Sequence, residues 1–328
     1  MTQKYKNVYI NETSTVTGPY ENNGPFNKLF DKSYTDLYFG KKTWEDAESK
    51  SINDAIDILL KKLDSNVFNI DLIISGDLLN QITASNYAMI NVPVAYIGVY
   101  AACATSTLGL LVGANMIENG MVENTICTVS SHNNGAEKQF RYPVEYGGPK
   151  PKTTTFTATG AAGAYLSSEK RGIKLESSTI GKVIDSNIND VYHMGAVMAP
   201  AAADTIYSHL KDTGRNINYY DLILTGDLGI YGKEILKEYM AKEYGISLEK
   251  YNDTGVMLYD LDTQSVYAGA SGPVCAPLVV YSYIFSQMKM GKLKKVLLVA
   301  TGALMSTSRF NEKETIPAVA HAISLEAL

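Results

Sequence analysis

The sequence contains two copies of one octapeptide. DLIISGDL spans residues 71–78 and DLILTGDL spans residues 221–228, with six of eight positions identical. A second pair of matching segments follows in the same order, NGMVENTICTVSS at 119–131 and MGKLKKVLLVATG at 290–302. Repeats that recur in the same order predict a chain built from two similar units. We therefore expect an N-terminal half, residues 1–172, and a C-terminal half, residues 173–328.

Within each half, strand and helix patterns alternate. In the first half Thr43 precedes an amphipathic helix, with Asp46 at the position expected of a capping box. The strands expected from apolar runs are 71–75, 94–100, 124–130, 221–225, 255–259, 266–268 and 295–300. Further helices are expected at 201–210, 233–244 and 275–289. This alternation predicts a mainly parallel sheet in each half, with helices on both faces.

One helix pattern is apolar on every face. Residues 108–117 contain only Leu, Val, Ile, Met, Ala, Gly and one Asn, so this helix must be buried on all sides. Two such helices, one from each half, would lie between the two sheets. The sequence therefore predicts an α/β fold with five layers in the order αβαβα, made of two duplicated βαβαβαββ halves.

Composition excludes several classes of protein. A net charge of −5 and a pI of about 5.5 give no electrostatic footprint for nucleic acid. The three cysteines lack CxxC spacing, which argues for reduced thiols and against a disulfide framework or a cysteine zinc site. We find no phosphate-binding, dinucleotide or metal-binding motif, so no cofactor and no metal are expected. No charged residue stands between Asp77 and Glu118, but Asn, Gln and Pro interrupt this stretch. We expect a soluble protein without a signal peptide or a membrane span.

Four loops follow the carboxyl ends of expected strands, where α/β proteins bind their ligands. These loops are 101–107, 131–146, 226–231 and 269–277. Cys103 begins a helix, where backbone N–H groups and the helix dipole would lower the pKa of its thiol and favour a nucleophile. The alternative is a small buried apolar side chain, because free cysteine is among the most buried residue types.

Residues 132–155 are rich in Gly and Pro and read as a functional loop. His132 directly follows a strand and is expected on the same rim as Cys103. Lysines and one arginine alternate here with aromatic residues: Lys138, Phe140, Arg141, Tyr142, Tyr146, Lys150 and Lys152. Cations beside aromatic faces suit a planar anionic ligand, although a solvated loop or a dimer contact fits equally. His209, late in a helix, is expected near the surface or paired with the helix dipole, while His193 and His321 fit a structural or a pocket-lining role.

The duplicated half, the cysteine before a buried helix and AGASG (268–272) resemble the thiolase and ketoacyl-synthase superfamily. More specifically, several motifs are similar to the stage V sporulation protein AD family. They are SSHNNGAEKQFRYPVEYGG (130–148), MGAVMAPAAADTI (194–206), DLILTGDLG (221–229), YAGASG (267–272), ATGALMS (300–306) and KETIPAVAHA (313–322). The resemblance spans nearly the whole chain.

This resemblance implies a thiolase fold and a role in loading dipicolinic acid, pyridine-2,6-dicarboxylate, into the developing spore during sporulation. The ligand would be the acid or its calcium chelate, and no nucleic acid is involved. The implied partners are membrane-embedded proteins of the same operon. The implied location is the forespore or spore interior, peripherally on the inner spore membrane. Thiolase-fold proteins usually dimerise through the sheet edge of the first half, so a homodimer is expected.

The resemblance also shows which catalytic positions have changed. Val266 stands where thiolases have a histidine, and Gly226 and Asp227 stand where ketoacyl synthases have one. Gly269 occupies the place of their asparagine, and Val299 lies near the place of the second thiolase cysteine. Only Cys103 remains of the catalytic set.

We therefore expect a binding protein that is not an enzyme. The ligand-binding residues expected are Cys103, His132, Asn133, Lys138, Arg141, Tyr142, Gly269 and Ser271. The first alternative is an acyl-CoA-dependent acyltransferase or condensing enzyme that uses Cys103 with His132 as a relocated base. The second is a scaffold for a transport complex with a vestigial pocket.

Overall fold

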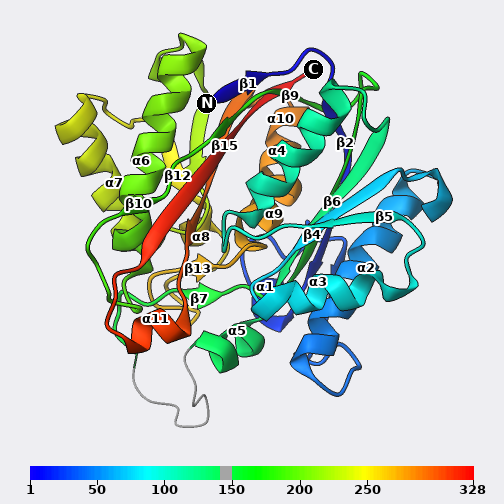
Figure 1. Ribbon diagram of the computed structural model, residues 1–328, viewed down its shortest axis with the longest axis horizontal. Coiled ribbons are helices and arrows are strands. Elements are labelled where there is room, and N and C mark those ends of the chain that lie inside the picture. Colours follow the sequence, from blue (N-terminus) through cyan, green and yellow to red (C-terminus); the bar gives the residue numbers. More distant parts are fainter. Residues whose placement is uncertain (141–149) are drawn as a thin grey trace.

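The computed structural model describes residues 1–140 and 150–328 and contains one continuous 13-stranded ladder. Its ten main strands divide into two five-stranded sheets, with helices between and outside them (Figure 1). The first sheet contains β2 (Tyr9–Thr17), β4 (Leu72–Gly76), β5 (Ala95–Gly98), β6 (Asn124–Ser131) and β8 (Gly160–Ser167). The second contains β9 (Ile173–Ile180), β11 (Leu222–Thr225), β12 (Tyr251–Asp253), β14 (Lys295–Ala303) and β15 (Pro317–Ala327). The strand orders β2-β8-β6-β4-β5 and β9-β15-β14-β11-β12 are equivalent, as the sequence repeat requires.

The two sheets meet at β2 and β9, which share only two residue pairs, Tyr9 with Lys174 and Ile10 with Ile173. Short strands complete the ladder: β1 (Thr2–Lys4), β3 (Lys32–Ser33), β10 (Ile184–Asp185) and, in a separate pair, β7 (Phe156–Thr157) with β13 (Ala270–Ser271). β1 pairs with β9, so the first residues of the chain lie on the second sheet.

The helices form three layers, which confirms the expected five-layer fold. The helices are α1 (Pro19–Asn22), α2 (Trp44–Lys62), α3 (Thr83–Ala88), α4 (Thr105–Glu118), α5 (Asn133–Phe140), α6 (Met194–Thr213), α7 (Gly229–Tyr244), α8 (Thr254–Met257), α9 (Cys275–Val279), α10 (Phe285–Lys289) and α11 (Thr307–Asn311). Figure 1 shows α4, α9 and α10 between the sheets, with α6 and α7 outside one sheet and α2 and α3 outside the other. Separate apolar clusters fill these three interfaces.

Local chemistry explains where the expected helices begin. The side chain of Thr43 accepts a hydrogen bond of 3.1 Å from the N–H of Asp46 and caps α2 as expected. α4 contains no charged residue before Glu118 and packs against strands of both sheets, which is the burial that its composition predicted. In the described part of the chain, no helix is both long enough and apolar enough to cross a membrane.

Several expectations about local structure are wrong. The sheets are parallel only at their outer strands, because β2, β8, β9 and β15 are long antiparallel strands. The strands expected at 255–259 and 266–268 are absent: α8 occupies the first segment, and the second is a loop before β13. Residues 133–140 form α5 rather than a loop. The helix expected at 275–289 contains a π-helical stretch, Val280–Ile284, between α9 and α10.

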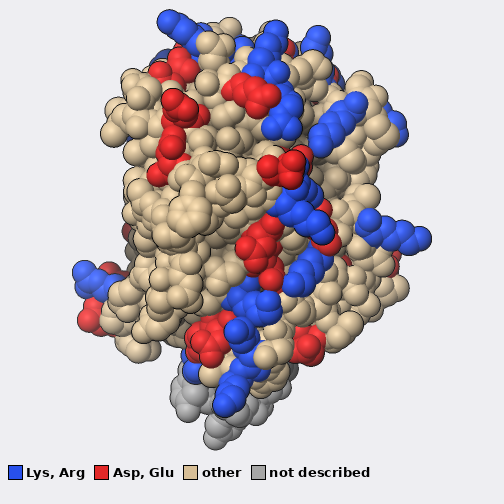
Figure 2. Space-filling model, turned by 90° about the vertical axis from the view of Figure 1, so that its right-hand side faces the viewer, with Lys and Arg blue, Asp and Glu red and all other residues tan. Residues whose placement is uncertain are grey.

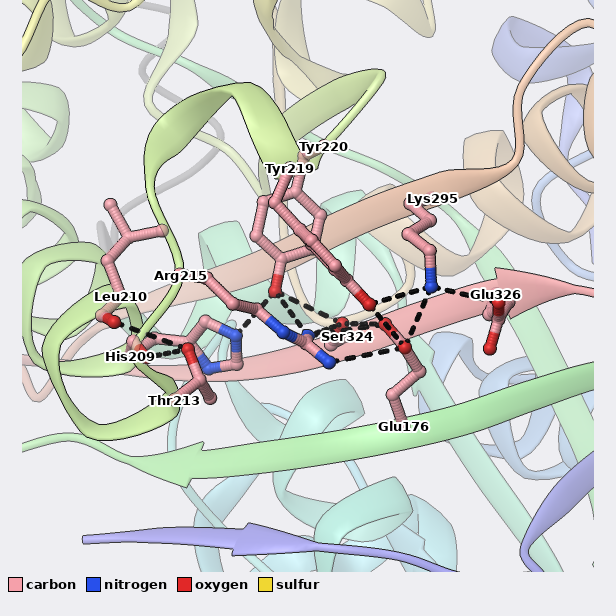
Figure 3. A network of polar contacts seen from close by, with 10 residues as sticks. All are labelled: Glu176, His209, Leu210, Thr213, Arg215, Tyr219, Tyr220, Lys295, Ser324 and Glu326. Carbon is pink, nitrogen blue, oxygen red and sulfur yellow. Dashed lines mark hydrogen bonds and ion pairs between the residues drawn. The ribbon is translucent and has the colours of Figure 1, made fainter.

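A polar network fastens α6 to the second sheet (Figure 3). Glu176 of β9 accepts from Arg215, Lys295, Tyr219 and Ser324 at 2.6–3.2 Å. His209 is fully buried, contrary to the expected surface position, and it bridges two hydroxyls. Its Nδ1 lies 2.7 Å from Thr179 Oγ1 and its Nε2 lies 2.6 Å from Tyr220 Oη.

Candidate functional site

A cavity of about 70 Å³ lies where both halves meet, at the carboxyl ends of their strands. Its lining is mostly apolar and comes from α5, α6, β7, β13 and the loops after β4, β5, β11 and β14. The lining residues are Leu78, Tyr100, Ala102, Cys103, Ala136, Glu137, Phe140, Thr155, Thr157, Met194, Met198, Asp227, Ser271, Ala303 and Met305. This volume holds roughly five water molecules, which suits a small polar group rather than a long chain.

The loop before α4 holds Cys103 in the cavity wall. Ala102 adopts a left-handed conformation with φ 49°, which alanine rarely takes and which costs on the order of 1 kcal/mol. Thr105 closes this turn, since its Oγ1 accepts from the N–H of Ala101 and donates to the carbonyl of Ala102. Gly302 of β14 packs directly against the loop, because a Cβ there would lie 2.2 Å from the carbonyl oxygen of Ala101. The two halves thus fix the position of the thiol together.

Asp227 is the polar partner of Cys103. The carboxyl group is fully buried and accepts hydrogen bonds from Thr301 Oγ1 at 2.7 Å, from the N–H of Gly272 at 3.2 Å and from the thiol of Cys103. Burial, and next the Asp227 carboxylate, raise the pKa of the Cys103 thiol well above its usual value. Burial raises the pKa of Asp227 to about 7, although the donors oppose this shift.

The octapeptide repeat explains why Asp227 reaches the cavity. Its counterpart Asp77 has a local role: it accepts from the N–H groups of Leu79 and Ser85, both at 2.8 Å. In the second half Asp253 takes this role and accepts from the N–H groups of Leu228 and Gly229 at 2.9 and 3.0 Å. Asp227 is therefore not needed as the acceptor for these two N–H groups, and its side chain lines the cavity with Cys103.

His132 lies away from the cavity. Its ring is buried beside Trp44 and Phe39, with centroid separations of 6.4 and 6.2 Å. Nε2 donates to the carbonyl of Leu37 at 2.8 Å, and Nδ1 accepts from the N–H of Gly135 at 3.4 Å. Burial lowers the pKa of this histidine. Both ring nitrogens therefore make hydrogen bonds within the fold. His132 does not lie where it could act as a base for Cys103.

Of the other residues expected to bind the ligand, some line the cavity and others do not. Ser271 lines the cavity with Cys103, whereas Asn133 is buried and donates to the carbonyl of Thr157 at 3.3 Å. Gly269 lies outside the lining, with φ 118° and a backbone too close to Gly255 for any Cβ. Lys138 is exposed and pairs with Glu45 at 2.7 Å. Arg141 and Tyr142, like Tyr146, lie outside the described residues.

Cations and histidines elsewhere have structural partners. Lys150 forms an ion pair of 2.7 Å with Glu137, which lines the cavity. A cation therefore lies directly behind one of the lining residues. His193 caps α6 by accepting from the N–H of Ala196 at 3.4 Å. His321 is buried in β15 and accepts from the N–H of Gly181 at 3.2 Å. In the described part of the chain, no cluster of three or more His, Cys, Asp or Glu side chains could hold a metal ion.

An outer groove of about 360 Å³ adjoins the cavity. Leu78, Tyr100, Phe140 and Met305 line both spaces and separate them. The described lining of the groove is uncharged and mixes apolar side chains with polar ones, which are Asn80, Gln81, Gln139, Ser306 and Thr307. Gln139 ties α5 to this floor, since its side chain accepts from the N–H of Asn80 at 2.7 Å and donates to the carbonyl of Leu78 at 2.9 Å.

Comparison with known proteins identifies the family. The family model of stage V sporulation protein AD matches residues 2–326. The chain belongs to the stage V sporulation protein AD family. Stage V sporulation protein AD of Bacillus subtilis strain 168 is 43% identical over 320 residues, which cover 97% of this chain and 94% of that protein.

Solved structures support the thiolase-like fold of this stage V sporulation protein AD homologue. Cerulenin-bound OleA from Xanthomonas campestris aligns with a TM-score of 0.63 at 14% identity, covering 99% of this chain and 100% of that one. A variant of the same OleA aligns with a TM-score of 0.62, covering 99% of both chains. At this identity the likeness concerns the fold alone.

The sequence did not single out Asp227 as a site residue. The available signal was the repeat itself, because SGD and TGD place an aspartate after equivalent strands in both halves. The second signal was the place of Asp227 at the position where ketoacyl synthases have a histidine. Neither signal says which aspartate faces the cavity, since that depends on Asp253.

Proposed function

We propose that the protein binds dipicolinic acid, or its calcium chelate, without catalysing a reaction, and that it serves the uptake of this ligand into the developing spore. The observation that carries the proposal is that Cys103 shares its cavity with the carboxyl group of Asp227, while the described lining holds no histidine, lysine or arginine. A nucleophilic cysteine needs a base or a cation that lowers its pKa. Here the neighbouring group raises the pKa, so the thiol stays protonated.

The shape of the site supports a small planar ligand. The cavity of about 70 Å³ accommodates one end of such a molecule, and the adjoining groove accommodates the other. Phe140 and Tyr100 stand at the boundary, where a flat ring can lie against aromatic faces. Lys150, paired with the lining residue Glu137, brings a cation close to the cavity.

Titration calorimetry with dipicolinate, with and without calcium, tests this proposal. We expect saturable binding to the wild-type protein, and weaker binding of benzene-1,3-dicarboxylate, which lacks the ring nitrogen. The A303F variant should fill the cavity and weaken binding at least tenfold, because Ala303 lines it. The matched A241F variant places the same side chain on the exposed face of α7 and should bind like the wild type. No heat at millimolar dipicolinate would contradict direct binding.

The alternative is acyl transfer by Cys103, which the thiolase-like fold allows. This alternative requires an acyl adduct on the thiol after incubation with an acyl-CoA. Mass spectrometry of the intact protein and of the Cys103→Ala variant measures it. We expect no adduct and no release of CoA, because the described cavity lining offers Cys103 a carboxyl group and no imidazole.

The proposed partners are a second copy of this chain and membrane-embedded proteins of the same operon. The proposed location is the forespore or spore interior, peripherally on the inner spore membrane. β5 ends the first sheet and has a ladder partner on one side only. Tyr87 and Ile90 are exposed by 65% and 70% in the charge-free segment around this strand. Figure 2 views the side of the molecule on which β5 lies and shows a broad area without charged side chains. These features favour a homodimer at this edge, which sedimentation velocity would detect.

A further inference from the structure

Asp227 places a buried carboxyl group in a cavity that we propose binds an anion. The ligand is an anion, yet the described cavity lining holds two carboxyl groups and no lysine, arginine or histidine. Glu137 is paired with Lys150, but the hydrogen-bond donors of Asp227 are all uncharged: Thr301, Gly272 and Cys103. An ionised Asp227 would therefore repel a ligand carboxylate at short range in a buried site.

We propose that Asp227 binds the ligand as a neutral carboxylic acid, so that one proton enters the site with each ligand anion. This inference rests on the proposed function and names the form in which the site takes its ligand. The O–H of Asp227 donates to a ligand carboxylate, and the two carboxyl groups share the proton. The one bond that forms is the O–H of Asp227, and its proton comes from solvent. A protonated carboxyl is a strong donor to an ionised one, so the pair takes the place of a cation, which the described lining does not supply.

The surroundings of Asp227 favour the neutral form. Asp253, on β12, is buried with both carboxylate oxygens engaged, and its charge disfavours a second charge at Asp227. Burial is the largest cause of the raised pKa values of the Cys103 and Cys275 thiols, so neither thiol adds a charge beside Asp227. With its pKa raised to about 7, Asp227 takes up a proton near neutral pH at little cost.

The pH dependence of dipicolinate affinity tests the inference. In the absence of calcium, the dissociation constant of the wild-type protein should rise about 30-fold between pH 6 and pH 8.5, since affinity falls tenfold per unit above the pKa of a group that must be protonated. The ligand carboxylates are ionised throughout this range. Calorimetry in buffers of different ionisation enthalpy should show uptake of about one proton per ligand at pH 8. This second measurement needs no variant.

Three variants sharpen the test. D227N keeps the shape but cannot ionise, so its affinity should change less than threefold over the same range. T301V removes a donor that stabilises ionised Asp227 and should move the fall in affinity to higher pH. D77N replaces the repeat counterpart, which does not line the cavity, and should keep the wild-type pH dependence.

The outcomes separate this inference from the proposed function. Binding without proton uptake would overturn the inference alone. Affinity that rises with pH in the presence of calcium would also overturn it, because ionised Asp227 would then contact the metal ion of the chelate. Absence of binding at every pH would overturn the proposed function and the inference together.

Discussion

Alkylation of Cys103 by iodoacetamide at pH 8 is expected to be slow in the native protein and about tenfold faster in the D227N variant. Asp227 is the second cause, after burial, of the raised pKa of this thiol. Removing its charge lowers that pKa, so a larger fraction of the thiol is ionised at pH 8 and can react. The rate is measured by mass spectrometry of peptides from samples quenched over time.

The other two thiols serve as internal controls. Cys127 and Cys275 are wholly buried and should be labelled only in denaturant, whereas Cys103 is partly buried at the cavity. A wild-type Cys103 that reacts faster than an unstructured thiol would show an activated nucleophile. Such a result would contradict the binding role and favour acyl transfer.

His209 is expected to make the stability of the fold strongly dependent on pH. Burial, and next the nearby Arg215, lower the pKa of this histidine to about 4, whereas Glu176 and Asp212 oppose the shift. Its folded-state pKa lies below the unfolded value of about 6.5, so its contribution to stability is present above pH 6.5 and is lost as the pH falls toward 4. The loss between pH 7 and pH 4.5 should be on the order of 2 kcal/mol.

Urea unfolding at the two pH values measures this contribution as a difference between variants. H209Q keeps groups that can contact Tyr220 (Figure 3) and Thr179 but cannot be protonated. Its stability relative to the wild type should therefore improve by about that amount at pH 4.5. The H193Q variant, at the opposite end of α6, serves as the matched control and should follow the wild type. Equal pH dependence in H209Q and the wild type would show that His209 accepts a proton without cost to the fold.

The repeat predicted the most about the fold. Equivalent octapeptides fixed equivalent strands, β4 and β11, and the composition of α4 placed a helix between two sheets. The direction of the inner strands could not be predicted in this way. β8 and β15 are buried on both faces like parallel strands, and burial rather than direction determines their apolar composition.

The site was predictable at the level of loops and less so at the level of side chains. Strand-end reasoning brought the loops of Cys103, Asp227 and Ser271 to one place, where they line one cavity. It also placed His132 near that rim, but Leu37 and Trp44 from a distant segment hold the ring instead. Contacts between segments about 90 residues apart leave no local pattern in the sequence, so such side-chain orientations need the structure.

The two aspartates of the repeat illustrate how a duplicated chain can acquire a new role. Asp77 still supports its own turn, while Asp253 supports the corresponding turn in the other half. A change at position 227 therefore leaves the two N–H groups of that turn with their acceptor, whereas a change at position 77 removes the acceptor of its own turn. Asp77 is thus required by the fold of its own turn, whereas residue 227 can change according to the ligand that the cavity binds. The two halves therefore share a backbone fold, although equivalent aspartates in them have different roles.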